Sequence, residues 1–90
     1  MQKRLAVYSI TEERTRLAFG AALYAIDENC VDIINDHATA FNSDKSLKEL
    51  HQTLVSSCIK PGDDAWILTL DKPFTGNGIA LDDLRAFLSN

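Results

Sequence analysis

The chain has 90 residues, a formal net charge of −4 and two cysteines, Cys30 and Cys58. This length supports one small core, so we expect a single domain over residues 1–90. The negative charge disfavours avid, non-specific binding to nucleic acid, and the nearest candidate for a basic patch, residues 2–4, is short. The sequence has no charged-then-apolar leader and no apolar run of about 18 residues. It predicts a cytoplasmic protein with two reduced, half-buried thiols.

The stretch Leu5–Ile10 predicts a short β-strand on which the rest of the fold is built. Alternate side chains of a strand point to opposite faces. One face would carry Leu5, Val7 and Ser9, and the other Ala6, Tyr8 and Ile10. Because both faces are apolar, we expect this strand in the middle of a sheet that is covered on both sides.

A helix is predicted from about Thr11, a good N-cap, to about Asp27. It carries two apolar stripes at helical spacing. Because almost no polar residue occurs between Leu17 and Ile26, the helix is either buried over more than one face or meets a partner with its outer face. A close approach of another backbone would explain Gly20 in mid-helix, where glycine is unfavourable. The stripes are Phe19, Ala22, Leu23 and Ile26, and Leu17, Ala21 and Tyr24.

The middle of the chain predicts a hairpin and a second helix. Strands over residues 30–34 and 37–42 flank a tight Asn35-Asp36 turn. Ser46 and Glu49 have the spacing of a capping box. The helix that follows should end at Pro61-Gly62 and pack on the sheet through one stripe, formed by Leu47, Leu50, Leu54 and Cys58.

The last third predicts a fourth strand over residues 65–71, a loop over 72–78 and a short helix over 79–90. The strand is apolar on both faces. We expect the C-terminal helix to pack on the domain through Leu81, Leu84 and Leu88, with Phe87 beside them.

This order predicts an α+β fold, a ferredoxin-like β-α-β-β-α-β domain with a short C-terminal helix. The first and third strands would be central, and the two long helices would cover one face of the sheet. Soluble monomers rarely expose a large apolar patch, so we expect the other face to be closed by a homodimer. The predicted dimer face consists of Leu5, Val7, Trp66, Leu68 and Leu70.

The chain resembles the SinR-like and VapD-like small proteins and the CRISPR-associated adaptation protein (Cas-two) that shares their fold. The resemblance covers nearly the whole chain. It depends on a first strand ending in Tyr8-Ser9-Ile10, the Asp44-Lys45-Ser46 entry to the second helix, and Pro61-Gly62-Asp63-Asp64 before an apolar strand. A glycine-containing loop and a short amphipathic helix then follow. This resemblance implies a homodimer whose sheets face each other.

Several members of this group are metal-dependent nucleases, with an aromatic-Asp-apolar triplet at the end of the first strand. The resemblance implies that one such aspartate from each subunit would hold a divalent cation. Here the triplet is Tyr8-Ser9-Ile10, and the neutral hydroxyl of Ser9 is a poor ligand for Mg²⁺. Glu12 and Glu13 could reach the same region as displaced carboxylates, or they could simply favour the helix N-terminus.

Three hypotheses about function remain. The first is a non-catalytic, dimeric protein-interaction module related to phage-defence or toxin–antitoxin families. The second is a metal-dependent nuclease of RNA or DNA with a displaced carboxylate. The third is an inhibitor of a nucleic-acid-binding complex. We favour the first, and we expect no catalytic residue, no metal site and no cofactor, since no phosphate-binding loop, Cys-x-x-Cys or hydrolase motif occurs.

Overall fold

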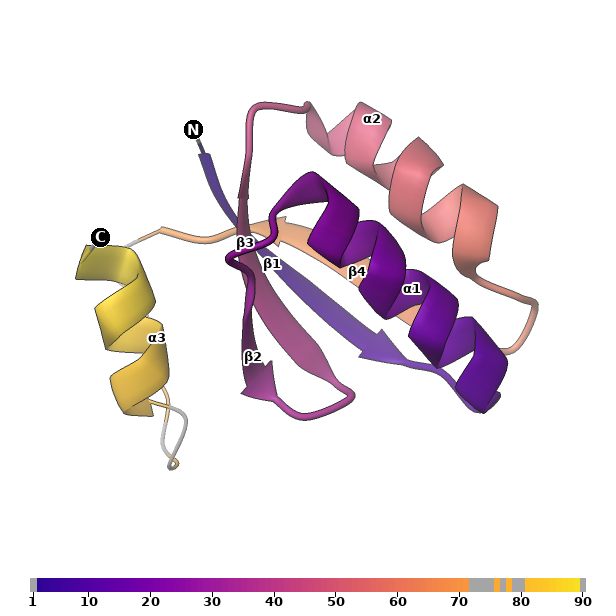
Figure 1. Cartoon of the computed structure of the whole chain (residues 1–90), viewed down its shortest axis with the longest axis horizontal. Coiled ribbons are helices and arrows are strands. Elements are labelled where there is room, and N and C mark those ends of the chain that lie inside the picture. The colour runs from indigo at the N-terminus through magenta and orange to yellow at the C-terminus, as the bar shows by residue number, and fades with distance from the viewer. Residues whose placement is uncertain (1, 72–75, 77, 79–80, 90) are drawn as a thin grey trace.

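The computed structural model describes residues 2–71, 76, 78 and 81–89. It contains four strands and three helices around one sheet (Figure 1). None of the helices in these ranges is long and apolar enough to cross a membrane. The elements in chain order are β1 (Gln2–Ser9), α1 (Glu13–Ile26), β2 (Val31–Ile34), β3 (Ala38–Ser43), α2 (Leu47–Leu50), its π-helical continuation η1 (His51–Ser56), β4 (Asp64–Thr69) and α3 (Leu81–Ser89).

The four strands form one antiparallel sheet in the order β2-β3-β1-β4. The predicted central position of the first and third strands is therefore confirmed, as is the mixed class with helices and an antiparallel sheet. The hairpin turn is also found, and it places Asp36 in the left-handed region at φ 62°, which aspartate tolerates better than most residues. The predicted loop over residues 72–78 lies largely outside the described residues.

One face of the sheet, the covered face, is packed against α1, α2 and η1 (Figure 1). The core on this face combines side chains from the sheet and from the helices packed against it. The Tyr8 and Phe19 rings meet edge to face, with centroids 4.8 Å apart, the arrangement that aromatic pairs prefer. The buried cluster consists of Ala6, Tyr8, Ile10, Phe19, Leu23, Phe41, Leu50 and Leu54.

Strand β1 begins three residues earlier than predicted, and this buries Arg4 on the covered face with only 5% of its surface exposed. Its Nη1 donates to the Thr69 hydroxyl and its Nη2 to the Lys45 carbonyl oxygen at 3.4 Å. Within the described residues, its Nε has no hydrogen-bond partner. The candidate basic patch at residues 2–4 is therefore wrong, because the strand turns Arg4 into the protein.

Helix α1 begins at Glu13, with Glu12 at the N-cap and no side-chain cap. The predicted Thr11 cap is wrong, because the helix begins one residue later than a Thr11 cap would place it. The Thr11 backbone N–H donates to Asp63 Oδ1 at 3.2 Å. Phe19 and Leu23 are buried, whereas 68% of Leu17 and 60% of Tyr24 are exposed. Among the described residues, α1 is therefore buried over one face only, and the stripe with Leu17 and Tyr24 is exposed.

The second helix starts with the predicted capping box. Glu49 N–H donates to Ser46 Oγ, and Ser46 N–H donates to Glu49 Oε1, both at 3.2 Å. Only Leu47–Leu50 is α-helical before the wider turns of η1 begin. Beyond Leu50, Ser57 Oγ donates a hydrogen bond to the Gln52 carbonyl oxygen, five residues earlier, at 2.6 Å. This separation matches the five-residue spacing of a π-helix. Leu50 and Leu54 are buried as predicted, but Leu47 is exposed.

Helix α3 lies apart from α1 and α2, next to the edge at β2 (Figure 1). Its anchor is Phe87, which is buried, while Leu84 and Leu88 are only partly buried and the Leu81 side chain lies outside the described residues. Lys3 of β1 donates to the Phe87 carbonyl and lies 4.9 Å from the centroid of its ring. Helix α3 therefore packs on the domain, but chiefly through Phe87, which is more buried than Leu84 and Leu88.

Candidate functional site

The face of the sheet opposite α1 and α2, the open face, carries large exposed apolar side chains. The β1–β4 register sets Val7 opposite Trp66 and Leu5 opposite Leu68, and directly opposite residues share a face. Trp66 is 65% exposed and Leu68 47% exposed, while Leu5 and Val7 are half-buried. These four residues form the exposed centre of this face.

The borders of the open face are set by β3 and α3. On the other side of β1 from β4, the β1–β3 register sets Ala38 opposite Val7 and Ala40 opposite Leu5. Both alanines are buried. The Leu70 backbone N–H donates to the Lys3 carbonyl at 2.9 Å, which continues the pairing one residue beyond β4. Helix α3 covers only the corner where Phe87, Val31 and Asn42 line a shared pocket. All five predicted dimer-face residues therefore lie on β1, on β4 or directly after it, and α3 leaves Trp66 and Leu68 uncovered.

The Tyr8-Ser9-Ile10 triplet divides into two core residues and one exposed residue. The Tyr8 ring packs on Phe19, and Ile10 is buried in the same cluster. Only Ser9 faces solvent, directly opposite Asp64 in the β1–β4 register. The triplet thus provides one accessible hydroxyl, and its flanking residues hold the strand in the core.

The Tyr8 hydroxyl lies in a short hydrogen-bonded chain. It is 2.9 Å from Thr39 Oγ1, which donates its own hydrogen to Asp32 Oδ1 at 3.0 Å. Because Thr39 has one hydrogen to donate, Tyr8 is the donor to Thr39. Burial raises the pKa of Tyr8 above its usual value, and the nearby carboxylates of Asp32 and Asp36 raise it further. Tyr8 is therefore a neutral, structural phenol.

The two predicted displaced carboxylates do not join Ser9 in a metal site. Glu12 forms an ion pair with Lys60 at 3.1 Å, and Glu13 is exposed in the first turn of α1. The carboxylate set opposite Ser9 is Asp64, which begins β4. The sequence could have indicated Asp64 as a neighbour of Ser9 only if the register of β4 against β1 had been known. Among the described residues no three His, Cys, Asp or Glu side chains gather around one point.

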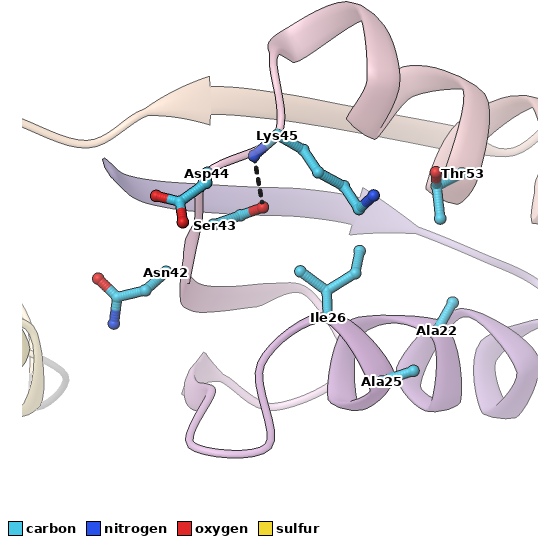
Figure 2. Close-up of a pocket in the computed structure, with 8 residues that line it drawn as sticks. All are labelled: Ala22, Ala25, Ile26, Asn42, Ser43, Asp44, Lys45 and Thr53. Carbon is cyan, nitrogen blue, oxygen red and sulfur yellow. Dashed lines mark hydrogen bonds between the residues drawn. The ribbon is translucent and has the colours of Figure 1, made fainter. Parts of the chain in front are cut away.

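A shallow pocket of about 490 Å³ lies between α1, η1 and the loop from β3 to α2 (Figure 2). Its floor is formed by Ala22, Ala25 and Ile26, and the Lys45 side chain extends from the loop toward Thr53. Lys45 backbone N–H donates to Ser43 Oγ at 3.1 Å, which shapes the loop. The polar groups at its rim do not converge on one point as they do in ligand sites.

The two cysteines are free and half-buried. Burial is the main cause that raises the pKa of the Cys30 thiol, and the carboxylates of Asp27 and Asp32 raise it further. Since the thiolate is the reactive form, this environment disfavours a nucleophilic role for Cys30.

No family model matches this chain, and a search of curated proteins returns no match. Its function is therefore argued from its own residues.

Proposed function

We propose that this protein is a non-catalytic, homodimeric interaction module with a ferredoxin-like fold, which associates through the open face of its sheet. The observation that carries the proposal is the exposure of Trp66 and Leu68 side by side with Val7 and Leu5. A contiguous apolar patch of this kind is typical of an interaction surface. Trp is also among the residues that contribute most to binding at protein interfaces.

The strand order β2-β3-β1-β4, with α1 and α2 on one face, supports the ferredoxin-like assignment. Together, α2 and η1 form the second helix of the six-element pattern, and the terminal α3 is an addition to it. This arrangement is consistent with the resemblance to SinR-like and VapD-like proteins. On that basis we propose a role within a phage-defence or toxin–antitoxin system, with a protein as partner.

A second copy of the chain is the simplest cover for the open face. A two-fold axis through the face would bring Trp66 and Leu68 of one copy onto the same strands of the other. The four residues at its centre are all apolar, so the centre of such a contact would bury no charge.

The single tryptophan of the chain makes this contact directly measurable. We expect light scattering at micromolar concentration to give twice the chain mass. Dilution should shift the Trp66 emission to longer wavelength, because the exposed indole loses its apolar cover. Leu68→Lys should abolish both effects while keeping the fluorophore. Leu47→Lys, a matched change at an exposed leucine on α2, should change neither.

A monomer at every concentration, or a Leu68→Lys chain that associates like the wild type, would exclude the open-face dimer. An effect of Leu47→Lys equal to that of Leu68→Lys would show that the loss is general and not specific to the open face.

The alternative nuclease function is favoured by one observation, the Asp64 carboxylate directly opposite Ser9. Our proposal expects no EDTA-sensitive cleavage of a mixed RNA and DNA pool by the wild-type chain. Cleavage lost in Asp64→Asn, or in Glu12→Gln/Glu13→Gln, would replace the non-catalytic proposal with the nuclease and identify its carboxylate.

A further inference from the structure

The two edges of the sheet, at β2 and at β4, differ in how well they are protected. Strand β2 has four residues, a bulge interrupts its pairing with β3, and α3 lies beside it (Figure 1). Shortness, a bulge and a covering helix are usual protections of an edge strand. Strand β4 has six residues in unbroken register with β1, and none of these three protections occurs along it among the residues that the structure describes.

Two hydrogen bonds establish which backbone groups of β4 point outward, away from β1. The Leu70 N–H donates at 2.9 Å to the carbonyl of Lys3, which lies directly opposite in the register. On the other side of β1, the Tyr8 N–H donates to the His37 carbonyl at 2.8 Å. Residues along an antiparallel strand direct their backbone groups alternately to one side and the other. The odd-numbered residues of β4 therefore direct their N–H and C=O groups outward, and they are Ala65, Ile67 and Thr69.

The outward backbone groups of these three residues form a hydrogen-bonding edge that is open to another chain. Within the described part of the chain, no hydrogen bond reaches the backbone N–H or C=O of Ala65, Ile67 or Thr69. Donors and acceptors that repeat at every second residue match the backbone of an extended strand, and not that of a helix. The segment from Ala65 to Leu70 also has no charge, proline or glycine, a composition that favours strand pairing.

The side chains along β4 specify what an added antiparallel strand would carry. Its residues opposite Trp66 and Leu68 would lie on the open face beside these exposed side chains, in the pairs where cross-strand side chains approach most closely. Apolar residues at these two positions would shield the indole and the leucine from solvent. Asp63 and Asp64 stand at the start of β4, so the residues opposite them should be basic. The added strand therefore reads, from its N-terminus, apolar-x-apolar-x-basic-basic.

A second copy of β4 fits this edge less well. The register that pairs all three outward residues of both copies sets Ile67 opposite Ile67. The same register sets Asp63 of each copy opposite Asp71 of the other, and like charges directly opposite each other destabilise a strand pair. The net charge of −4 on each chain adds to the repulsion. Charge therefore favours a different, basic chain at this edge.

We propose that the outer edge of β4 binds an extended segment of another protein, which adds an antiparallel strand with the order apolar-x-apolar-x-basic-basic. Main-chain hydrogen bonds supply the affinity in strand addition of this kind, and the alternate side chains supply the specificity. The proposal rests on the proposed role as an interaction module. It does not require the open-face dimer, because it uses the backbone edge of β4 and not the face of the sheet.

The first experiment uses the wild-type chain and the capped peptide Thr-Val-Thr-Val-Thr-Lys-Lys, whose two valines would face Leu68 and Trp66. NMR titration should give a Kd below about 1 mM, and the reversed sequence should bind about tenfold more weakly. In the free chain the outward amides of Ala65, Ile67 and Thr69 should exchange rapidly with solvent. The peptide should slow their exchange. A peptide that does not bind, or that binds without slowing these amides, overturns the proposal.

Peptide variants test the pairing itself without changing the protein. N-methylation of the threonine opposite Ile67 removes a donor to the Ile67 carbonyl and should weaken binding by about tenfold. The N–H of the valine opposite Trp66 would point away from β4. N-methylation of this valine is the matched control and should change binding by less than about twofold. Equal effects of the two modifications overturn strand addition.

A charge reversal tests the direction of the added strand. Asp64→Lys should weaken binding of the peptide by about fivefold and strengthen binding of the same peptide with two C-terminal glutamates. Asp82→Lys, at an exposed position of α3, is the matched control and should change neither. An equal effect of Asp64→Lys and Asp82→Lys overturns the predicted position of the basic residues.

The exchange of the Ile67 amide also separates this proposal from association of two copies. Slow exchange in the free chain that becomes faster on dilution would identify a second copy as the occupant of the edge and overturn the proposal. The open-face dimer leaves this amide free and is detected by its mass. Failure of the dimer and failure of strand addition are therefore observed separately.

Discussion

The two faces of the sheet have similar amino-acid composition and opposite environments. On the covered face, Ala6 and Phe41 are fully buried under α1, α2 and η1. On the open face, Trp66 and Leu68 are largely exposed, although their strand pairs with the same β1. The difference shows that the apolar residues of the strands determine how many faces of the sheet must be shielded from solvent. They do not determine whether the shielding residues belong to the same chain.

The largest expected effect tests this contrast directly. Phe41→Ala should lower the free energy of unfolding by about 3–5 kcal/mol, because it leaves a cavity in a buried cluster. Trp66→Ala should cost about 1 kcal/mol or less in the monomer, since its side chain is mostly solvated. Urea titrations followed by circular dichroism, both in the Leu68→Lys background, measure the two values without a contribution from dimerisation. Equal costs would contradict the assignment of the two faces.

The next effect concerns the corner of the open face that α3 covers. Phe87→Ala should lower the free energy of unfolding by about 2–3 kcal/mol, because this buried ring anchors the helix. Truncation after Gly78 should lower the melting temperature clearly for the same reason. Arg85→Ala, on the exposed side of α3, is the control and should have little effect. A truncated chain with an unchanged melting temperature would mean that α3 stabilises nothing in the monomer.

The covered face also depends on how α2 begins. Ser46→Ala should cost about 1 kcal/mol through loss of the capping box. The backbone N–H of Ser46, together with its hydroxyl, holds the pKa of Glu49 below its ordinary value. A lowered folded-state pKa adds stability above the unfolded-state pKa of about 4.3, and this stability is lost as the pH falls through the folded-state value.

The pH dependence identifies this contribution. Urea titrations from about pH 6 down to pH 3 should show a smaller loss of stability in Glu49→Gln than in the wild type. Ser46→Ala keeps the backbone N–H and loses only the hydroxyl, so its pH profile should lie between those of the wild type and Glu49→Gln. A Glu49→Gln chain with the wild-type pH profile would show that the cap does not depend on the charge.

The smallest expected effect concerns the exposed side of α1. Gly20 is exposed in mid-helix, and a methyl group there would meet nothing within 4 Å. Gly20→Ala should therefore raise the free energy of unfolding of the monomer by up to about 1 kcal/mol. Gly62→Ala should lower it, because Gly62 adopts φ +95°. A destabilised Gly20→Ala monomer would indicate a close contact on this side of α1 within the chain.

The features predicted correctly from the sequence are those with a local physical cause. The Ser46–Glu49 capping box, the Asn35-Asp36 turn and the alternation of β1 each depend on a few neighbouring residues. The buried stripe at Phe19 and Leu23 follows from helical periodicity alone. These signals were sufficient for the element order and for the central position of two strands.

The features missed depend on distant residues. The Thr11 backbone N–H donates to Asp63, 52 positions away in the sequence. Arg4 is buried through partners on β4 and after β3. The apolar stripe that predicts the second helix does not distinguish the π-helical turns of η1 from ordinary α-helical turns. At the candidate site, Asp64 faces Ser9 only because β4 pairs with β1 in one particular register.

The register of β4 against β1 is determined weakly by hydrophobic residues and strongly by polar ones. Both faces of β4 are apolar, so after a slip of one residue Trp66 and Leu68, in place of Ala65 and Ile67, would still set apolar side chains against the covered face. The slip would, however, move the Thr69 hydroxyl to the other face and take it away from Arg4. A permanently charged guanidinium would then remain buried without this acceptor, at a cost of several kcal/mol. Arg4 therefore discriminates between alternative pairings of β4 that hydrophobicity alone would leave close in energy.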